Sequence, residues 1–294
     1  MALLPRRARV VLPLLAIAIG ASSAIAQPRL LVNVNDAGRY VYGGLHYGGQ
    51  QWATMTSTLN RVFTGGVTTT NTLLDLSQML TYDALWVDQR FQTTASAAEI
   101  DNLKAYAATG RRVVVMGENA AWGGWNQQIL GAFGGIEGPL GGYGILDYGS
   151  PSGGLTGAGC LYGRNVSVQP NALTQGVSAI SLACGGYAIG GVQLFAYNVA
   201  TLWGSTQNVL TVLDANIFDD LFAGYDAPVF RDRVATWLSA SRPTLTTASL
   251  RVATLNAAVA PVGAQVVSPE PTTLLLLAGG IVVLSVATRR TRRS

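Results

Sequence analysis

The chain has 294 residues, of which 49% are hydrophobic and 12% are charged, and its formal net charge is +4. Seven of its nineteen basic residues lie in the two terminal segments, namely Arg6, Arg7, Arg9, Arg289, Arg290, Arg292 and Arg293. Residues 27–288 therefore carry twelve basic and fifteen acidic side chains, a net charge of about −3. The positive net charge of the whole chain is therefore no evidence for nucleic-acid binding, which needs basic residues clustered on the domain itself.

The first 26 residues have the layout of a secretory signal peptide. Arginines precede an apolar run over residues 10–19, and small residues then lead to Ala24, Ile25 and Ala26, an A-x-A cleavage site. Such a segment is removed during export, so the mature chain is expected to begin at Gln27. The alternative is that the segment is retained as an N-terminal membrane anchor.

Residues 27–242 are long enough for one domain with a substantial core. Buried strands are expected at residues 29–35, 82–88, 112–116 and 209–214, and helices at residues 49–63, 97–110, 122–133 and 230–239. Ser96 and Glu99 form a capping-box signature before the second helix, and Gly110 is a stop signal after it. Because strands alternate with helices, we expect an α/β fold with a mostly parallel sheet and helices on both faces.

The pattern is interrupted between residues 134 and 191, where a glycine-rich insertion of loops and short β-hairpins is expected. This segment contains both cysteines of the chain, Cys160 and Cys184. Exported proteins form disulfides in oxidising compartments, so we expect these two to pair. Closing a loop of this size contributes on the order of 3 kcal/mol. The alternative is a catalytic cysteine, for which no histidine lies nearby in the sequence.

Four acidic residues follow expected strands: Asp36, Asp88, Glu118 and Asp214. In an open parallel sheet the carboxyl ends of the strands line the crevice where ligands bind, so these side chains are expected to converge on one rim if their strands are adjacent. Three alternatives remain open. The carboxylates bind a cation through oxygen ligands, they act as an acid and base on a glycan, or each one caps the helix or turn that follows it.

Three stretches carry a resemblance to a known superfamily: YDALWVDQR with VVVMGEN after the next helix, NALTQGV at residues 171–177, and VLTVLDANIFDD at residues 209–220. Together they resemble the class I glutamine-amidotransferase-like superfamily, which implies a flavodoxin-like α/β fold. Its amidotransferases carry a cysteine nucleophile in the turn after the strand that matches VVVM. That turn here reads Gly117, Glu118 and Asn119, and the late histidine partner is missing because His46 is the only histidine. The resemblance therefore implies the fold without the glutaminase chemistry.

The C-terminus combines a proline-rich motif, an apolar segment and a basic end. After an extended linker at residues 243–266, the sequence reads Val267, Ser268, Pro269, Glu270 and Pro271. Residues 272–288 carry no charge and, as a helix, would rise about 25 Å, near the lower limit for crossing a bilayer. The arginines of residues 289–294 would stay cytoplasmic under the positive-inside rule. A cleaved signal peptide gives the same topology, with the body outside.

This order of motif, apolar segment and basic end resembles the PEP-CTERM sorting signal of Gram-negative bacteria. The resemblance covers residues 267–294 and implies processing by exosortase, a membrane protease-transpeptidase, in proteins associated with exopolysaccharide and biofilm matrix. The prolines Pro269 and Pro271 fix φ and disfavour helix before them, so the motif would be held extended just outside the membrane. The alternative is an ordinary single-pass anchor.

These observations predict an exported protein that is anchored in the inner membrane until its tail is processed, and is then located at the cell surface or outside the cell. Its body is expected to bind or to serve structure without a cofactor, with exosortase and exopolysaccharide as partners and no nucleic acid. The alternative is an extracellular hydrolase that acts on polysaccharide through two of the four strand-end acids.

Overall fold

The computed structural model describes residues 27–34, 44–91, 93–119, 122–138, 161–195 and 198–241. The chain divides into two compact units, Met1–Thr244 and Leu245–Ser294, and all described residues belong to the first. Among them, no helix is both long enough and apolar enough to cross a membrane. The predicted signal peptide, linker, sorting motif, spanning segment 272–288 and basic tail all lie outside the described residues.

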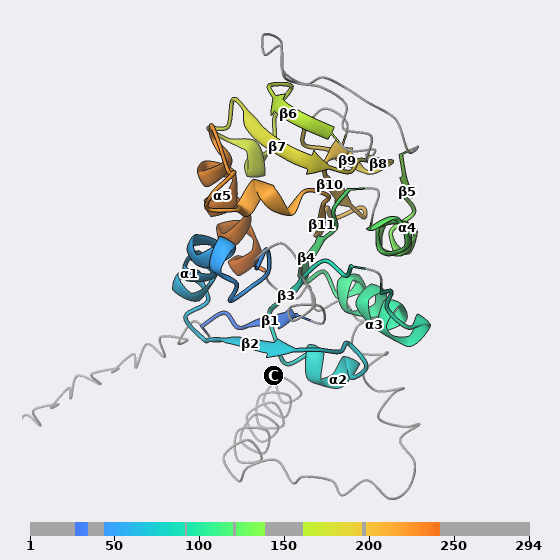
Figure 1. The fold of residues 1–294 in the computed structure, drawn as a ribbon. Coiled ribbons are helices and arrows are strands. Elements are labelled where there is room, and N and C mark those ends of the chain that lie inside the picture. Colours follow the sequence, from blue (N-terminus) through green and yellow to red (C-terminus); the bar gives the residue numbers. More distant parts are fainter. Residues whose placement is uncertain are drawn as a thin grey trace, which may run out of the picture. The chain divides into compact units, whose positions relative to one another are not determined.

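A seven-stranded sheet forms the centre of the body, in the order β2-β1-β3-β4-β11-β10-β9 (Figure 1). Its strands are β1 (Leu30–Asn33), β2 (Val67–Thr70), β3 (Ala84–Val87), β4 (Arg112–Met116), β9 (Val192–Gln193), β10 (Ala200–Trp203) and β11 (Val209–Val212). The first five in spatial order pair in parallel, and β10 and β9 continue the sheet in antiparallel pairing. The parallel part has the 2-1-3-4-5 order of flavodoxin-like folds.

Helices cover both faces of the sheet, as the sequence predicts. On one face, η1 (Gln50–Trp52), α1 (Ala53–Val62) and α5 (Ala227–Ser239) bury Trp52, Met55 and Phe230 in one apolar core. On the other, α2 (Leu76–Met79), α3 (Ala97–Ala108) and α4 (Gly123–Ala132) bury Tyr106 and Trp125 in a second core. The strands β1, β3, β4 and β11 contribute side chains to both cores, which explains their almost uninterrupted hydrophobic sequences.

Local sequence signals determine where several of the helices begin and end. The Ser96 hydroxyl accepts the Glu99 backbone N–H and the Glu99 carboxylate accepts the Ser96 N–H, so the predicted capping box is confirmed. The helix ends before Gly110, whose φ of +79° suits glycine. The last helix begins at Ala227, three residues before the expected start, with Pro228 in its first turn. Strands β2 and β10 and helix α2 were not predicted.

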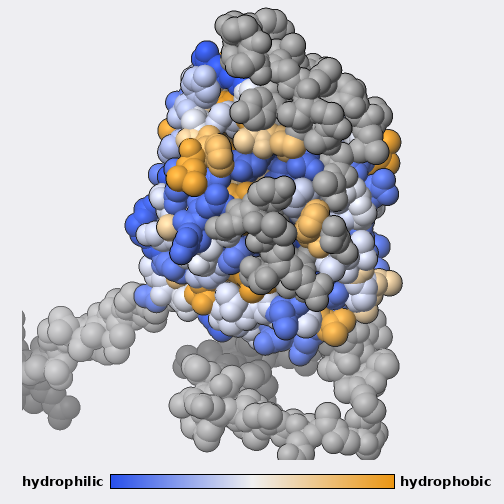
Figure 2. All heavy atoms as spheres, in the orientation of Figure 1, coloured by the Kyte–Doolittle hydropathy of each residue, from blue (hydrophilic) through white to orange (hydrophobic). Residues whose placement is uncertain are grey.

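The described part of the glycine-rich insertion forms short β-hairpins, as expected. β6 (Leu161–Asn165) pairs antiparallel with β7 (Ile180–Gly185), and β5 (Ile136–Glu137) pairs with β8 (Ala188–Ile189). Two short 3-10 helices complete the body, η3 (Ala172–Thr174) and η5 (Ala215–Phe218). Figure 2 shows one face of the body, on which hydrophilic side chains predominate and apolar ones form small separate groups.

Candidate acidic site at the carboxyl edge of the sheet

The structure brings three of the four predicted acids to the carboxyl ends of neighbouring strands. Asp88 follows β3, Glu118 lies two residues beyond β4, and Asp214 lies two residues beyond β11. All three are buried, with exposed fractions of 2% or less. Asp36, the fourth candidate, lies outside the described residues. The parallel pairing of β3, β4 and β11 therefore explains why these residues share one edge.

Glu118 and Asp214 form a buried pair of carboxyl groups. Burial, and then the negative charge of Asp214, raises the pKa of Glu118 well above its usual value. Burial also raises the pKa of Asp214 to about 7, although hydrogen bonds from backbone and side-chain donors oppose the shift. Burial acts against ionisation of both carboxyl groups, and the negative charge of Asp214 adds to this effect at Glu118.

The oxygens of this pair are acceptors for backbone N–H groups. Glu118 Oε2 accepts from Ala215 at 2.9 Å, and Oε1 accepts from Asn119 at 3.2 Å. Asp214 Oδ1 accepts from Asn216 at 2.9 Å, which caps η5. Asp214 Oδ2 accepts from Ala183 in β7 at 3.0 Å. The expected capping role is therefore confirmed for Asp214, and Glu118 binds the first residue of the same 3-10 helix.

Asp88 performs a different structural task. Its Oδ1 accepts from the indole Nε1 of Trp86 at 2.7 Å, and its Oδ2 accepts from the backbone N–H of Tyr47 at 3.1 Å. Burial raises the pKa of Asp88 to about 7 against these two hydrogen bonds. The next residue, Gln89, donates its side-chain amide to the Leu45 carbonyl. Asp88 and Gln89 thus attach the glycine-rich loop before η1 to the end of β3.

The turn after β4 is held by a residue that the sequence reasoning missed. Asn126 in α4 accepts the Glu118 N–H at 3.2 Å and donates to the Glu118 carbonyl at 2.6 Å. It also donates to Glu137 Oε1 at 2.7 Å. A Cβ atom at Gly117 would lie 2.5 Å from Asn126 Oδ1, so only glycine fits there. The only feature of the sequence that pointed to Asn126 was a polar residue among the apolar positions of the expected helix.

The turn after β4 consists of Gly117, Glu118 and Asn119 and contains neither cysteine nor histidine. His46 lies on the loop before η1, with its Nδ1 2.9 Å from the Tyr47 carbonyl oxygen. Cys184 does lie close to the turn, because its Sγ accepts from Asn119 Nδ2 at 3.3 Å. Cys160 is outside the described residues, so its disulfide with Cys184 stays a prediction. The absence of glutaminase chemistry remains the expectation.

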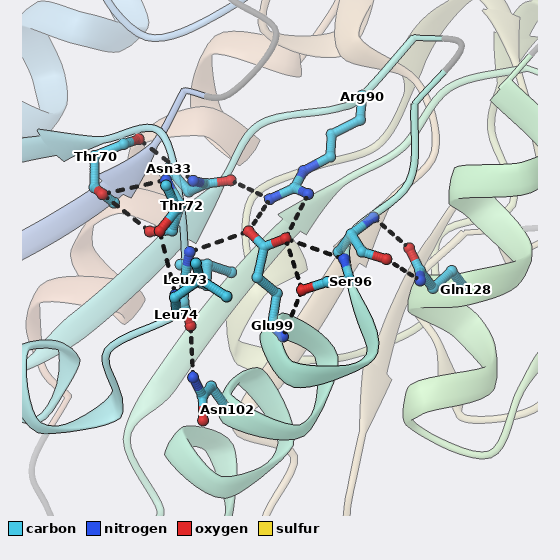
Figure 3. Close-up of polar contacts among 11 residues, drawn as sticks. Asn33, Thr70, Thr72, Leu73, Leu74, Arg90, Ser96, Glu99, Asn102 and Gln128 are labelled. Atoms are coloured by element: carbon cyan, nitrogen blue, oxygen red, sulfur yellow. Dashed lines mark hydrogen bonds and ion pairs between the residues drawn. The ribbon is translucent and has the colours of Figure 1, made fainter.

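A second polar cluster joins the segment after β3 to the last residue of β1 and the first turn of α3 (Figure 3). Arg90 is 1% exposed, and its Nη2 donates to Asn33 Oδ1 at 2.9 Å and to Glu99 Oε1 at 3.0 Å. Its guanidinium also lies over the Trp125 ring at 5.0 Å. Burial acts to raise the pKa of Glu99, but hydrogen bonds from Arg90 and Ser96 and the charge of Arg90 outweigh it, so the net pKa is lowered.

The Glu99 carboxylate therefore joins three segments. Besides Arg90 and the capping box, its Oε1 accepts the Leu73 N–H at 3.1 Å, in the segment between β2 and α2. The sequence signalled only the capping box, because the contact with Arg90 depends on the packing of α3 against the sheet. Arg90 and Asn33 were not among the predicted site residues, although both lie at strand ends.

Neither cluster offers a metal site. No group of three or more His, Cys, Asp or Glu side chains in the described ranges is arranged to hold a metal ion. The cation alternative thus has no support from Asp88, Glu118 and Asp214. Open hollows lie beside Gly48 and Asn60, with a volume of about 430 Å³, and beside Gln169 and Gln175, with a volume of about 320 Å³.

Comparisons with known proteins concern the fold. No protein-family model matches the sequence, and no curated protein matches it as a relative. The solved structure described as "mmIFT52 N-terminal domain" is similar with a TM-score of 0.52 and 12% identity, covering 72% of this chain and 97% of that one. A putative GMP synthase component from Thermoplasma acidophilum aligns with a TM-score of 0.41 and 12% identity, covering 78% and 98%. The body of this protein is a mixed α/β domain with a mostly parallel central sheet.

Proposed function

We propose that the protein is exported, sorted by an exosortase-type protease, and located at the cell surface or in the extracellular matrix. The proposal is supported by the two ends of the sequence: a signal-peptide layout before Gln27, and the motif of Pro269, Glu270 and Pro271 before an apolar segment and a basic tail. The mildly acidic charge of residues 27–288 agrees with a body that does not bind nucleic acid.

We further propose that the α/β domain binds a partner, with exopolysaccharide as the candidate, or serves structure, and does not catalyse. The observation that carries this is the use of the described strand-end acids. Each one is buried, and each of their carboxylate oxygens accepts an N–H group of the protein itself. A general acid or base must reach a substrate atom within hydrogen-bond distance, directly or through one water.

The sorting proposal is tested by the C-terminal mass of the mature protein from its host. We expect a C-terminus near Pro271, without the basic tail, and the same protein with Glu270→Ala should keep an intact tail. A Thr288→Ser change, at the far end of the apolar segment, should not affect processing. An intact tail in the wild-type protein would leave a plain membrane anchor and overturn the proposal.

A second candidate function is an extracellular hydrolase acting on polysaccharide. It is favoured by one observation, the pairing of Glu118 and Asp214 with raised pKa values, because catalytic carboxyls are often tuned in this way. The test is hydrolysis of exopolysaccharide extracted from the host. Activity that is lost in Glu118→Gln but kept in Asp88→Asn would establish the hydrolase and overturn the non-catalytic proposal. If the protein hydrolyses the polysaccharide no faster than buffer alone does, the hydrolase is excluded.

A further inference from the structure

The hollow of about 430 Å³ is lined by the glycine-rich loop before η1 and by α1. Its volume lies within the range of about 300–1,000 Å³ that is usual for ligand sites. None of the described residues that line it is charged, and four of them have polar side chains: Gln50, Thr56, Ser57 and Asn60. We call this site the amide hollow.

The loop that forms one wall of the amide hollow is held in place at several points. The Gly48 N–H donates to Thr56 Oγ1 at 2.8 Å, and the Gly49 N–H donates to the His46 carbonyl at 2.9 Å. A Cβ atom at Gly49 would collide with the Gly44 carbonyl oxygen, so the loop packs against itself. The wall is therefore formed before any ligand binds, which lowers the entropy lost on binding.

The polar side chains of the amide hollow keep groups that can bind a ligand. The Tyr47 hydroxyl donates to Asn60 Oδ1 at 2.7 Å, which orients this amide and leaves Nδ2 as a donor. The Thr56 hydroxyl accepts from Gly48 and can still donate its own proton. Gln50 and Ser57 are exposed, and their side chains have no hydrogen-bond partner in the described part of the chain.

The charges around the amide hollow favour a neutral ligand. The amino end of a helix ordinarily attracts an anion. At α1, however, the Thr54 N–H already donates to Asp220 Oδ2 at 2.9 Å, so a carboxylate of the protein occupies this position. The lining itself offers no charged side chain to pair with a charged ligand. A ligand that fits is therefore neutral and offers both donors and acceptors.

Sugar chains have these properties, because each hydroxyl group both donates and accepts a hydrogen bond. The carboxamides of Gln50 and Asn60 likewise present a donor and an acceptor side by side. Peptides are usually bound by a free sheet edge, an apolar groove or a cluster of arginines. The described lining of the amide hollow offers none of these. Its chemistry thus favours a glycan over a peptide.

The second hollow, of about 320 Å³, has a similar neutral lining beside η3. Its polar side chains include Gln169, Asn171 and Gln175. The helix α5 packs against both α1 and η3, so the two hollows lie on elements that flank the same helix. Two separate hollows of the same chemistry favour a ligand that repeats its groups along a chain, because each hollow can hold an equivalent segment.

We propose that the amide hollow binds a neutral segment of a polysaccharide through hydrogen bonds from Gln50, Ser57 and Asn60. The proposal rests on the binding role proposed above for the α/β domain, and it names the site and the charge of the ligand. Because the hollow is open to solvent, it admits an internal segment of a long chain as well as a chain end.

The experiment measures binding of the full chain to exopolysaccharide extracted from the host and to an array of neutral and acidic oligosaccharides. We expect the wild-type protein to bind the extract and neutral members of the array, with no binding to acidic members and no competition from polar peptides. Removing one hydrogen bond of ordinary strength weakens binding about fivefold. Gln50→Ala combined with Asn60→Asp should therefore weaken it at least about tenfold.

The variants are chosen so that the domain keeps its fold. Asn60→Asp retains an acceptor for the Tyr47 hydroxyl and removes only the free amide donor. Ser57→Leu is an independent variant that fills part of the hollow from an exposed helix position, and it should also weaken binding. The matched control is Gln127→Ala, an exposed glutamine in α4 on the other face of the sheet, which should bind as the wild type does.

The possible failures can be told apart. If the wild-type protein binds the extract and both sets of variants bind it equally well, the domain holds glycan elsewhere, which overturns the amide hollow and leaves the binding role. If the wild-type protein binds neither the extract nor any neutral oligosaccharide, the binding role itself fails and the hollow with it. Binding of acidic oligosaccharides alone, or competition by peptides, would contradict the chemistry assigned to the hollow.

Discussion

The buried ion pair of Arg90 and Glu99 gives the sharpest prediction of stability. Glu99→Gln removes the charge of the carboxylate but keeps a side chain that can complete the capping box, since glutamine serves there as well as glutamate. Arg90 is 1% exposed and would be left as an unpaired buried cation. Breaking a buried pair in this way costs about 3–5 kcal/mol. We therefore expect Glu99→Gln to lower the free energy of unfolding by about that amount.

The matched control is an exposed pair on the same helix. Asp101 and Lys104 lie 3.6 Å apart with side chains 75% and 51% exposed. Exposed pairs contribute up to about 1 kcal/mol and often nothing measurable. Asp101→Asn should therefore have only a small effect. The double variant Arg90→Met with Glu99→Gln should recover part of the lost stability, because it removes the unpaired charge and leaves an apolar side chain beside Trp125.

Urea unfolding of the full chain, followed by tryptophan fluorescence, measures these free energies. All six tryptophans lie between Trp52 and Trp237, so the signal reports the α/β body and not the terminal segments. Linear extrapolation to zero denaturant then gives the difference between variants. If Glu99→Gln were no more destabilising than Asp101→Asn, Arg90 would have to be solvated in the folded protein, and the reasoning from its burial would be refuted.

Three further predictions use the same assay or mass spectrometry. The pKa of Asp88 is about 7 in the folded protein and about 4 in the unfolded chain, so this residue should make the free energy of unfolding fall as the pH rises from about 4 to 7. Asp88→Asn should weaken this dependence on pH, and an unchanged dependence would contradict the raised pKa of Asp88. Gly185→Ala should cost about 1–3 kcal/mol, since its methyl group would meet Asp214 at 2.9 Å. Gly131→Ala is the control: Gly131 lies in α4 with open space around it, so the change should stabilise the protein by up to about 1 kcal/mol. Equal losses of stability for the two variants would argue against close packing at the end of β7. Mass spectrometry of the exported protein should show a gain of two hydrogens on reduction if Cys184 is paired with Cys160, and Cys184→Ser should then lower stability by about 3 kcal/mol; an unchanged mass would exclude the disulfide.

The central strands could be predicted because their burial on both faces leaves a continuous hydrophobic run in the sequence. The run RVVVM matched β4 from Arg112 to Met116 without a shift. By contrast, β2 at the edge of the sheet consists of Val67 and three threonines with no buried side chain, so hydrophobicity gave no signal. The short α2 was missed for a related reason: a single turn is too short for a periodic pattern.

The acidic site was partly predictable for a geometric reason. Parallel strands end at the same edge, so Asp88, Glu118 and Asp214 had to lie at one rim once their strands were adjacent. Which of them would pair was not predictable, because it depends on side-chain directions set by packing. The positions of Asn126 and Arg90 depend on helices that pack against the sheet from segments distant in the sequence. Such contacts leave no local pattern.

The environment of Glu118 argues that this edge has been adapted to hold backbone. In a nucleophilic active site the turn after the strand presents a reactive side chain to solvent, and nearby N–H groups remain available to stabilise a developing oxyanion. Here the Ala183 and Ala215 N–H groups are taken up by carboxylate oxygens, and glycines bring the β7 backbone against the turn. Burying two carboxyl groups is costly, and at this edge their oxygens hold the end of β7 and the start of η5 in place.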